Sequence, residues 1–523
     1  MKAGRRVLRL TEPELQGATA IDVRFDGHRV WSTAVPEHKN GIVSIPWPEP
    51  VRRRLTGRCE VSIAETATAR VLASRPTRFD LSRKRLQITD KRGQWLAMTK
   101  WDRLGPVLGG SSDDVASRLI ASGARLVKDM QQWGYPLYLV GGVLLGMVRG
   151  GKLLPHDDDI DFAFLSDETD PAELGRVSYE MERLLARAGY TVVRHSLAHI
   201  ELVFFDDQGQ VDHYIDVFTG FFHEGMYCQP FALRGSQVTR ADLVPTKDII
   251  VNGVALPGPA NPEAWLAYAY GESWRVPDPT FKFIVDPGTK HRFESWFGVF
   301  NRGRFFWEKH WQGEERSQGS TAGVRAVQRM KRKLPAGSRV LDLGCGDGRW
   351  GQELAAAGHT VVGVDFSFEA LRVATSNDEH GVSYRRVNAN DRPALLALGA
   401  ELLDGGERWH VLISDVLHGL TFTNRANVYL LLKMMLTPGL RAVVSFDTHR
   451  SRRYKRPDPR TWHYPLRKFH QELAENGLAA RRVRTRLRKS EVGWRRYATA
   501  EIVAVPTRSV TESWATERPE NVS

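Results

Sequence analysis

The feature that most constrains the fold is a short apolar strand running directly into a glycine-rich turn, Arg-Val-Leu-Asp-Leu-Gly-Cys-Gly-Asp-Gly at residues 339–348. Glycine lets the backbone adopt positive φ angles and approach a ligand closely. A second apolar strand follows at residues 361–365 and ends in Asp365. An acidic residue about 20 residues beyond such a turn is placed to bind a ribose diol. The pattern therefore predicts a Rossmann-like α/β sheet.

Further apolar segments extend this predicted sheet. The segment 410–415 ends in another acid, Asp415, and a Leu-Thr-Pro-Gly break at residues 436–439 precedes the strand at 443–446. With a last strand near Ile502, these segments predict a domain over residues 321–507. The polar residues 508–523 are expected to form a frayed tail.

In this order, the elements resemble the class I S-adenosylmethionine-dependent methyltransferases. The loop also matches the dinucleotide pattern G-x-G-x-x-G, but Asp342 before it favours the methyl donor over NAD. Cys345 in the loop is expected to be a small apolar filler. His418 either accepts a proton in catalysis or is a packed or capping histidine. The resemblance implies these cofactor-binding residues: Asp342, Gly344, Gly346, Gly348, Asp365, Asn390 and Asp415.

A carboxylate cluster marks the middle of the chain. An apolar strand, a glycine turn and a helix start at residues 138–146 precede Asp-Asp-Asp-Ile-Asp at residues 157–161. So many adjacent carboxylates repel one another unless cations lie among them. If Ile160 lies in a strand, Asp159 and Asp161 share a face and can hold Mg²⁺ or Mn²⁺ together. The alternative is an acidic surface turn.

A third carboxylate is expected from the strand at residues 211–218. Ile215 and Val217 would face the core and leave Asp216 on the other side. Asp212 is a weaker candidate.

This region resembles the LicD/fukutin family, a branch of the nucleotidyltransferase fold. The matching elements are Gly141 to Gly146, Arg149, residues 157–161, residues 214–218 and Tyr-Gly-x-x-Trp-x-x-Pro at residues 270–277, with His156 where an aromatic Trp is usual. The family implies transfer of a phospho-alcohol from a CDP-activated donor to a glycan hydroxyl. It also implies that Asp159, Asp161 and Asp216 act in catalysis and bind metal, with Asp216 alternatively taking the acceptor proton. The residues expected near the donor phosphates are Gly141, Gly142, Arg149 and Lys152.

A rival motif overlaps this region. The segment 146–153 reads G-x-x-x-x-G-K-L, which differs from a P-loop by lacking the final Ser or Thr that binds Mg²⁺. Pro155 and the aspartates follow where a helix is required, so the P-loop interpretation is disfavoured.

The first 104 residues are expected to form a β-sandwich without a catalytic constellation. Expected strands lie at residues 21–25, 42–47, 59–63, 71–73 and 86–88, with a hairpin turn at Asp26 and Gly27. A helical pattern over 113–133 opens a middle α/β domain at residues 105–290. Large aromatic residues within 291–320, among them Phe297, Phe300, Phe305, Phe306, Trp307 and Trp311, predict a packed connector rather than a loose tether.

Composition sets broader limits. The 523 residues are 42% hydrophobic, as in globular proteins, with no apolar run long enough to span a bilayer and no apolar signal segment at the N-terminus. Three cysteines cannot build a disulfide framework or a cysteine-rich zinc site, so we expect a cytoplasmic protein. The net charge of +13 includes basic segments at residues 450–456 and 481–489. These segments suit nucleic acid, an anionic membrane surface, a phosphoglycan or plain solvation.

Together these features predict a bifunctional enzyme that decorates a cell-surface glycan or its precursor. One domain would transfer a phospho-alcohol from a CDP-activated donor to the phosphoglycan or polysaccharide acceptor, and the other would methylate the product. Peripheral contact with an anionic membrane is allowed, and nucleic acid is not the expected partner. The alternatives are a nucleic-acid or small-molecule methyltransferase with a nucleotide-handling middle domain, and a scaffold whose acidic cluster is structural.

Overall fold

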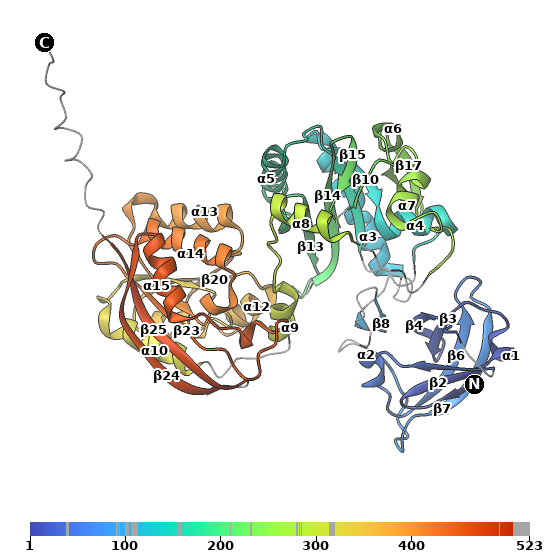
Figure 1. The fold of residues 1–523 in the computed structure, drawn as a ribbon, viewed down its shortest axis with the longest axis horizontal. Coiled ribbons are helices and arrows are strands. Elements are labelled where there is room, and N and C mark those ends of the chain that lie inside the picture. Colours follow the sequence, from blue (N-terminus) through green and yellow to red (C-terminus); the bar gives the residue numbers. More distant parts are fainter. Residues whose placement is uncertain are drawn as a thin grey trace, which may run out of the picture. The chain divides into compact units, whose positions relative to one another are not determined.

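The computed structural model describes residues 1–505 except for residues 38–40, 90–92, 94, 100–103, 106–112, 155–158, 210, 231–232, 279–280, 282, 284, 313–319 and 491. The chain divides into two compact units, Met1–Val299 and Phe300–Ser523, and each is described by itself (Figure 1). The division falls inside the aromatic segment that was expected to be a connector.

The first part of unit 1 contains two antiparallel sheets that share one apolar core. One sheet consists of β1 (Lys2–Ala3), β2 (Val7–Thr11) and β5 (Ile42–Pro46). The other has the order β4 (His28–Ala34), β3 (Ala20–Phe25), β6 (Arg58–Glu65) and β7 (Val71–Arg78). Short elements accompany them: α1 (Glu12–Leu15), α2 (Glu49–Arg52), β8 (Ala97–Met98) and β9 (Leu104–Gly105). The β-rich region is as expected, whereas its assignment to the β-sandwich class stays a prediction.

The predicted hairpin turn joins β3 to β4. Asp26 and Gly27 both have positive φ angles, as a two-residue loop of this type requires. The predicted strand at residues 86–88 is wrong. Leu86 and Ile88 are buried in the core, but isolated backbone hydrogen bonds to Arg58 and Leu96 take the place of a ladder there. The alternating apolar residues at 86–88 therefore indicate burial and not strand pairing.

A mixed sheet organises the rest of unit 1. Its order is β10 (Leu137–Val140), β11 (Ile160–Leu165), β14 (Val211–His223), β13 (His199–Phe205) and β12 (Thr191–Ser196). β11 and β14 run parallel, whereas the other neighbours in this order are antiparallel. β14 continues into β15 (Met226–Gln229) and β16 (Leu233–Gly235), and β17 (Lys247–Val251) pairs with β18 (Val254–Gly258). The helices are α3 (Asp113–Gln132), α4 (Gly141–Gly150), α5 (Pro171–Arg187), α6 (Arg240–Leu243), α7 (Pro262–Tyr270) and α8 (Pro287–Phe297).

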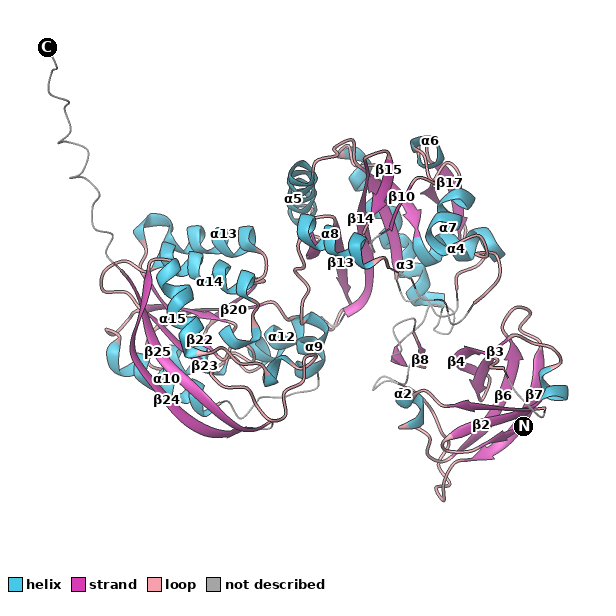
Figure 2. Ribbon diagram, in the orientation of Figure 1, coloured by secondary structure: helices cyan, strands magenta, loops and turns pink. Residues whose placement is uncertain are grey.

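Unit 2 contains a seven-stranded sheet with helices on both faces (Figure 2). The strand order is β21 (Ser383–Arg386), β20 (Thr360–Asp365), β19 (Arg339–Leu343), β22 (Trp409–Ser414), β23 (Ala442–Asp447), β25 (Gly493–Ala504) and β24 (Leu478–Ser490). The first five strands are parallel, and the last two are antiparallel to their neighbours. The helices are α9 (Arg304–Trp311), α10 (Thr321–Lys333), α11 (Arg349–Ala355), α12 (Phe368–Ser376), α13 (Arg392–Leu403), α14 (Phe422–Met435) and α15 (Leu466–Glu475). The predicted Rossmann-like sheet is confirmed.

Two apolar clusters pack this sheet, one on each face. α10 and α11 contribute to one cluster, and α13, α14 and α15 contribute to the other. The chain crosses from one face to the other at β19, where the strand order reverses, and ligands of such sheets bind at the carboxyl ends of the strands there.

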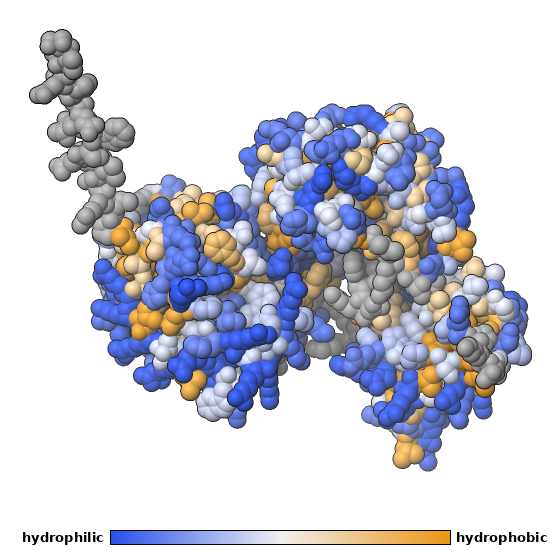
Figure 3. All heavy atoms as spheres, viewed as in Figure 1, coloured by the Kyte–Doolittle hydropathy of each residue, from blue (hydrophilic) through white to orange (hydrophobic). Residues whose placement is uncertain are grey.

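Hydrophilic residues dominate the face drawn in Figure 3, and hydrophobic residues form small scattered patches on it. Among the described residues, none of the helices combines the length and apolar character needed to cross a bilayer.

Candidate functional site

The first candidate site begins where β10 turns into α4. Gly141 has a φ angle of +69°, in the left-handed region that favours glycine. A Cβ atom at this position would lie 2.0 Å from Oδ2 of Asp161. Gly141 is therefore required both by the backbone conformation and by the carboxylate packed against it. The predicted sequence of strand, glycine turn and helix is confirmed.

The three predicted carboxylates converge next to Gly141. Asp161 lies in β11 directly opposite Asp216 in the parallel strand β14, and Asp159 immediately precedes β11. One oxygen from each carboxylate lies within 4.8 Å of the other two. Ile215 and Val217, on either side of Asp216, are buried in the core as expected.

Three carboxylates at this separation repel one another, and a cation bound between them would relieve that repulsion. Oxygen ligands of this kind suit Mg²⁺ and Mn²⁺. The donor set therefore fits the expected divalent ion, and the ligand roles of the three residues stay a prediction.

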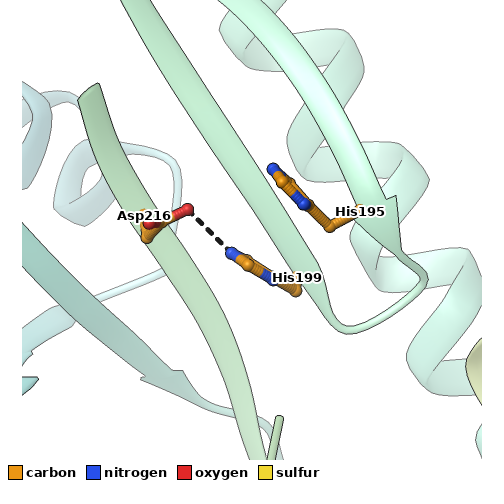
Figure 4. A group of neighbouring side chains, drawn as sticks. All are labelled: His195, His199 and Asp216. Carbon is orange, nitrogen blue, oxygen red and sulfur yellow. Dashed lines mark hydrogen bonds and ion pairs between the residues drawn. The ribbon is translucent and has the colours of Figure 1, made fainter. Parts of the chain in front are cut away.

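Two histidines that the sequence did not single out lie beside Asp216 (Figure 4). Nε2 of His199 in β13 lies 2.7 Å from Oδ1 of Asp216. The ring of His195 in β12 stacks on that of His199 with centroids 4.4 Å apart. Nε2 of His195 in turn lies 3.0 Å from Oε2 of Glu201. A hydrogen bond to a metal-binding carboxylate fixes its orientation, so His199 is placed to hold Asp216 in position.

Burial and the neighbouring His199 lower the pKa of His195, so the His195 ring is uncharged at neutral pH. His195, His199 and Asp216 also form a second group whose ligand atoms lie within 4.8 Å of one another. The signal in the sequence is the weak His-x-x-x-His pattern. What brings these residues together is the pairing of three strands, which that pattern does not reveal.

The predicted phosphate-binding residues separate into two groups. Gly142 follows Gly141 at the start of α4, next to the carboxylates. Arg149 lies in the last turn of the same helix, about 12 Å farther along its axis. Burial lowers the pKa of Arg149, with the nearby Tyr270 opposing the shift. Lys152 is exposed beyond the helix. The donor-binding roles of all four residues stay predictions.

The P-loop alternative is wrong. Residues 146–150 are part of α4, so their amides are used in the helix and cannot wrap around a phosphate. The weaker candidate Asp212 is held outside the cluster by an ion pair of 2.7 Å with Arg118. Asp157, Asp158 and His156 lie outside the described residues.

The second candidate site is the glycine turn after β19. Gly344, Gly346 and Gly348 have φ angles of +73°, +55° and +74°. Neighbouring side chains also approach closely: a Cβ atom on Gly344 would lie 2.3 Å from Val416, and one on Gly348 would lie 2.2 Å from the Tyr384 hydroxyl. Backbone conformation and packing thus both require glycine here.

Two acids flank this turn. Oδ2 of Asp365 accepts a hydrogen bond from the Gly346 amide at 3.1 Å, and Oδ1 accepts one from Ser367 at 3.0 Å. Asp342 is fully buried, and burial together with the Asp365 carboxylate raises its pKa to about 7. Within the described part of the chain, neither oxygen of Asp342 has a partner in hydrogen-bonding geometry. A buried carboxylate left this way beside a glycine cradle fits a cationic cofactor such as S-adenosylmethionine.

Asn390 holds the segment that leads into unit 2. Its side-chain amide donates to the Phe300 carbonyl at 3.1 Å, as that of Asn388 does at 2.7 Å. Trp311, at the end of α9, lies against Gly346, since a Cβ atom there would be 2.9 Å from the indole. Asn390 therefore has a structural contact, and its predicted contact with the cofactor stays a prediction.

The acids at the ends of β22 and β23 form an ion network with Arg488. The guanidinium of Arg488 lies 3.3 Å from Asp415 and 3.1 Å from Asp447. Burial alone would raise the pKa of Asp415, but Arg488 lowers it below its usual value. Asp415 has a φ angle of +60°, a strained conformation that is typical of functional sites.

His418 is buried beside this network, and burial lowers its pKa. Nδ1 accepts a hydrogen bond of 3.4 Å from the Asp447 amide, which places the proton of the neutral ring on Nε2. This geometry favours the packed-histidine alternative over a role as proton acceptor.

Comparison with known proteins finds a family match over each of the two regions that contain these sites. Residues 134–261 match the model of the LicD/FKTN/FKRP nucleotidyltransferase domain, and residues 316–482 match a model of a methyltransferase domain. The ubiquinone biosynthesis O-methyltransferase of Actinobacillus pleuropneumoniae is 43% identical over 58 residues, which are 10% of this chain and 25% of that enzyme. The match thus spans a quarter of that relative's length.

Among solved structures, an S-adenosylmethionine-dependent methyltransferase from Anabaena variabilis is 13% identical over 38% of this chain and 93% of that chain, with a TM-score of 0.33. The magnesium protoporphyrin IX methyltransferase of Synechocystis, solved with bound SAH, is 17% identical over 40% of this chain and 99% of that chain, with a TM-score of 0.27. By the two family models, the chain carries a LicD/FKTN/FKRP nucleotidyltransferase domain at residues 134–261 followed by a methyltransferase domain at residues 316–482.

Proposed function

We propose that the chain is a bifunctional transferase acting on a cell-surface glycan or its precursor. The LicD-type domain transfers a phospho-alcohol, of the phosphocholine or phospho-alditol type, from a CDP-activated donor. The methyltransferase domain then methylates the product or the glycan. The observation that carries the proposal is the convergence of Asp159, Asp161 and Asp216 inside a domain that matches the LicD family.

In the first reaction, an acceptor hydroxyl oxygen forms a bond to the donor phosphorus as the bond to CMP breaks. Asp159, Asp161 and Asp216 would hold a divalent cation, which when bound neutralises charge on the transferred phosphate. The start of α4 at Gly141 favours the negative charge of the donor. His199 orients Asp216, which acts either as one of the metal ligands or as the group that takes the hydroxyl proton.

In the second reaction, S-adenosylmethionine supplies an electrophilic methyl group when bound. Asp342 and the glycine turn receive its charged portion, and Asp365 receives the ribose hydroxyls. Since Nδ1 of His418 already accepts a hydrogen bond from the Asp447 amide, we expect the domain to work mainly by positioning the acceptor in line.

The test is CMP release from a panel of CDP-choline, CDP-glycerol and CDP-ribitol with Mg²⁺ and a glycan acceptor. Asp161→Asn should abolish release. Asp212→Asn is the matched control, because it removes the same charge from a carboxylate paired with Arg118 outside the cluster, and it should leave release intact. Equal release by wild type and Asp161→Asn would contradict the proposal.

A further inference from the structure

An open groove of about 690 Å³ lies between α10 and β24 in unit 2. The residues that line it are Arg329, Arg332, Lys333, Arg482, Arg484 and Glu501. None of these residues belongs to either site assigned above. The groove includes part of the basic segment 481–489, for which the sequence suggested several possible partners.

Positive charge in the groove is far from balanced. Among the described residues that line the groove, Glu501 is the one carboxylate, and it is already shared by Arg482 at 3.1 Å, Arg441 at 3.6 Å and Arg329 at 4.0 Å. Burial lowers the pKa of Arg329, and repulsion from neighbouring arginines adds to the shift although Glu501 opposes it. A bound anion would relieve this repulsion.

The backbone of β24 is irregular at the groove. The pairing of β24 with β25 shifts between Arg481 and Arg484, and Arg482 has a φ angle of +53°. An extra residue of this kind re-aims a side chain and is conformationally costly for a residue with a Cβ atom. Here it places Arg482 and Arg484 on the same groove.

A row of arginines connects the groove with the methyltransferase site. From Arg484 onward, strand alternation places Arg486 and Arg488 on one face, and the step from Arg484 to Arg488 covers about 13 Å. Arg488 ends the row at Asp415 and Asp447. α10 spans the same distance, because Ser320 at its start bonds to Asp415 while its other end lines the groove.

We infer that the groove and the arginine row bind a phosphodiester-linked glycan chain and lead it to the carboxyl ends of β22 and β23, where methyl transfer would take place. This inference rests on the proposed function, since it names the acceptor class of the second domain. Arginine forks match phosphate oxygens in pairs, which suits repeated phosphodiesters. Within the described part of the chain, the groove is lined by no aromatic side chain on which bases could stack, which favours a glycan phosphodiester over single-stranded nucleic acid.

The experiment measures binding of the full chain to a fluorescent poly(glycerol phosphate) oligomer at several salt concentrations. Arg332→Ala combined with Arg484→Ala removes two groove charges and leaves the Glu501 ion pairs in place. We expect the Kd to rise at least about tenfold and the salt dependence of binding to become shallower by about 1.4 in log–log slope. Arg467→Ala combined with Lys468→Ala removes the same charge from exposed positions of α15 and should leave both values unchanged.

Equal weakening by the two double variants, or no binding of the oligomer to the wild type, would overturn the inference. Tighter, equally groove-dependent binding of an oligothymidylate would assign the groove to nucleic acid, and binding of phosphatidylglycerol vesicles alone would assign it to a membrane surface. CMP release in the same variants should be unchanged. A failure of the first reaction would appear as absent CMP release with oligomer binding intact, so the two failures are distinguishable.

Discussion

Gly141 and Asp161 determine each other at the candidate metal centre. Gly141 has a left-handed backbone conformation, and the Asp161 carboxylate occupies the space where a Cβ atom at position 141 would lie. A methyl group at Gly141 would overlap the carboxylate and displace it from Asp159 and Asp216.

Gly141→Ala should therefore weaken Mn²⁺ binding and CMP release by about tenfold or more, because one ligand is forced out of place and the backbone is strained. Gly150→Ala in the same helix is the control. It meets no atom within 4 Å and should leave both quantities unchanged. If the two variants behave alike, the close packing of Gly141 has no functional role.

His199 is expected to act through Asp216 and not on the substrate. His199→Ala should reduce the affinity for Mn²⁺ by roughly 10- to 100-fold, since the carboxylate loses the partner that orients it. His199→Gln places an amide donor near the same position and should restore part of that affinity. If excess Mn²⁺ restores CMP release in His199→Ala, the defect lies in metal affinity and not in folding. A loss of CMP release that excess Mn²⁺ does not restore would argue against this role.

Asp342 makes the stability of unit 2 depend on pH. Its pKa is about 7 in the folded chain against an ordinary value of 3.8, so the folded state holds the proton more tightly. Stability from this group therefore falls as the pH rises from about 4 to about 7. The melting transition to follow is the one whose midpoint S-adenosylmethionine shifts when it is added. Measured without the cofactor, the midpoint of this transition should depend less on pH in Asp342→Asn than in the wild type. Parallel pH profiles for the two proteins would contradict the assignment.

At the scale of elements, α9 depends on the first turn of α12. Oε2 of Glu308 accepts hydrogen bonds from Oγ of Ser367 at 2.7 Å and from the Glu369 amide at 3.0 Å, and Oε1 accepts one from the Phe368 amide at 3.0 Å. These bonds hold Trp311, three residues farther on, against the glycine turn.

Glu308→Ala should destabilise unit 2 by about 1–2 kcal/mol and weaken binding of S-adenosylhomocysteine, because the start of α12 loses its acceptor and α9 is released. Lys309→Ala, at an exposed position of the same helix, should change neither value. Calorimetric titration and thermal melting measure both effects. Unchanged affinity in Glu308→Ala would show that α9 does not support the cofactor site.

Sequence patterns predicted the strands that carry both sites. Apolar runs ending in glycine or aspartate were sufficient for β10, β19 and β20, because burial leaves little choice of residue there, whereas β11 was expected only on the condition that Ile160 lies in a strand. β24 escaped prediction, since an edge strand tolerates the charged residues that mask its alternation. His195 and His199 escaped because their approach to Asp216 depends on the pairing of β12, β13 and β14. Local sequence therefore reveals ligands that belong to a motif and misses those supplied by strand register.

At the scale of the whole molecule, each unit contains one of the two candidate sites. The carboxylates lie within Met1–Val299 and the glycine turn within Phe300–Ser523. The two reactions are therefore expected to be separable by single substitutions. The net charge of +13 also has a local explanation in part, because several of its arginines gather at one groove and along β24.

The most direct measurement is a calorimetric titration of the full chain with Mn²⁺. The account predicts saturable binding by the wild type and by Asp212→Asn, and loss of that binding in Asp161→Asn and Asp216→Asn. Wild-type protein that binds no Mn²⁺, or Asp161→Asn and Asp216→Asn variants that bind it as the wild type does, would contradict the assignment of a metal centre to these strands.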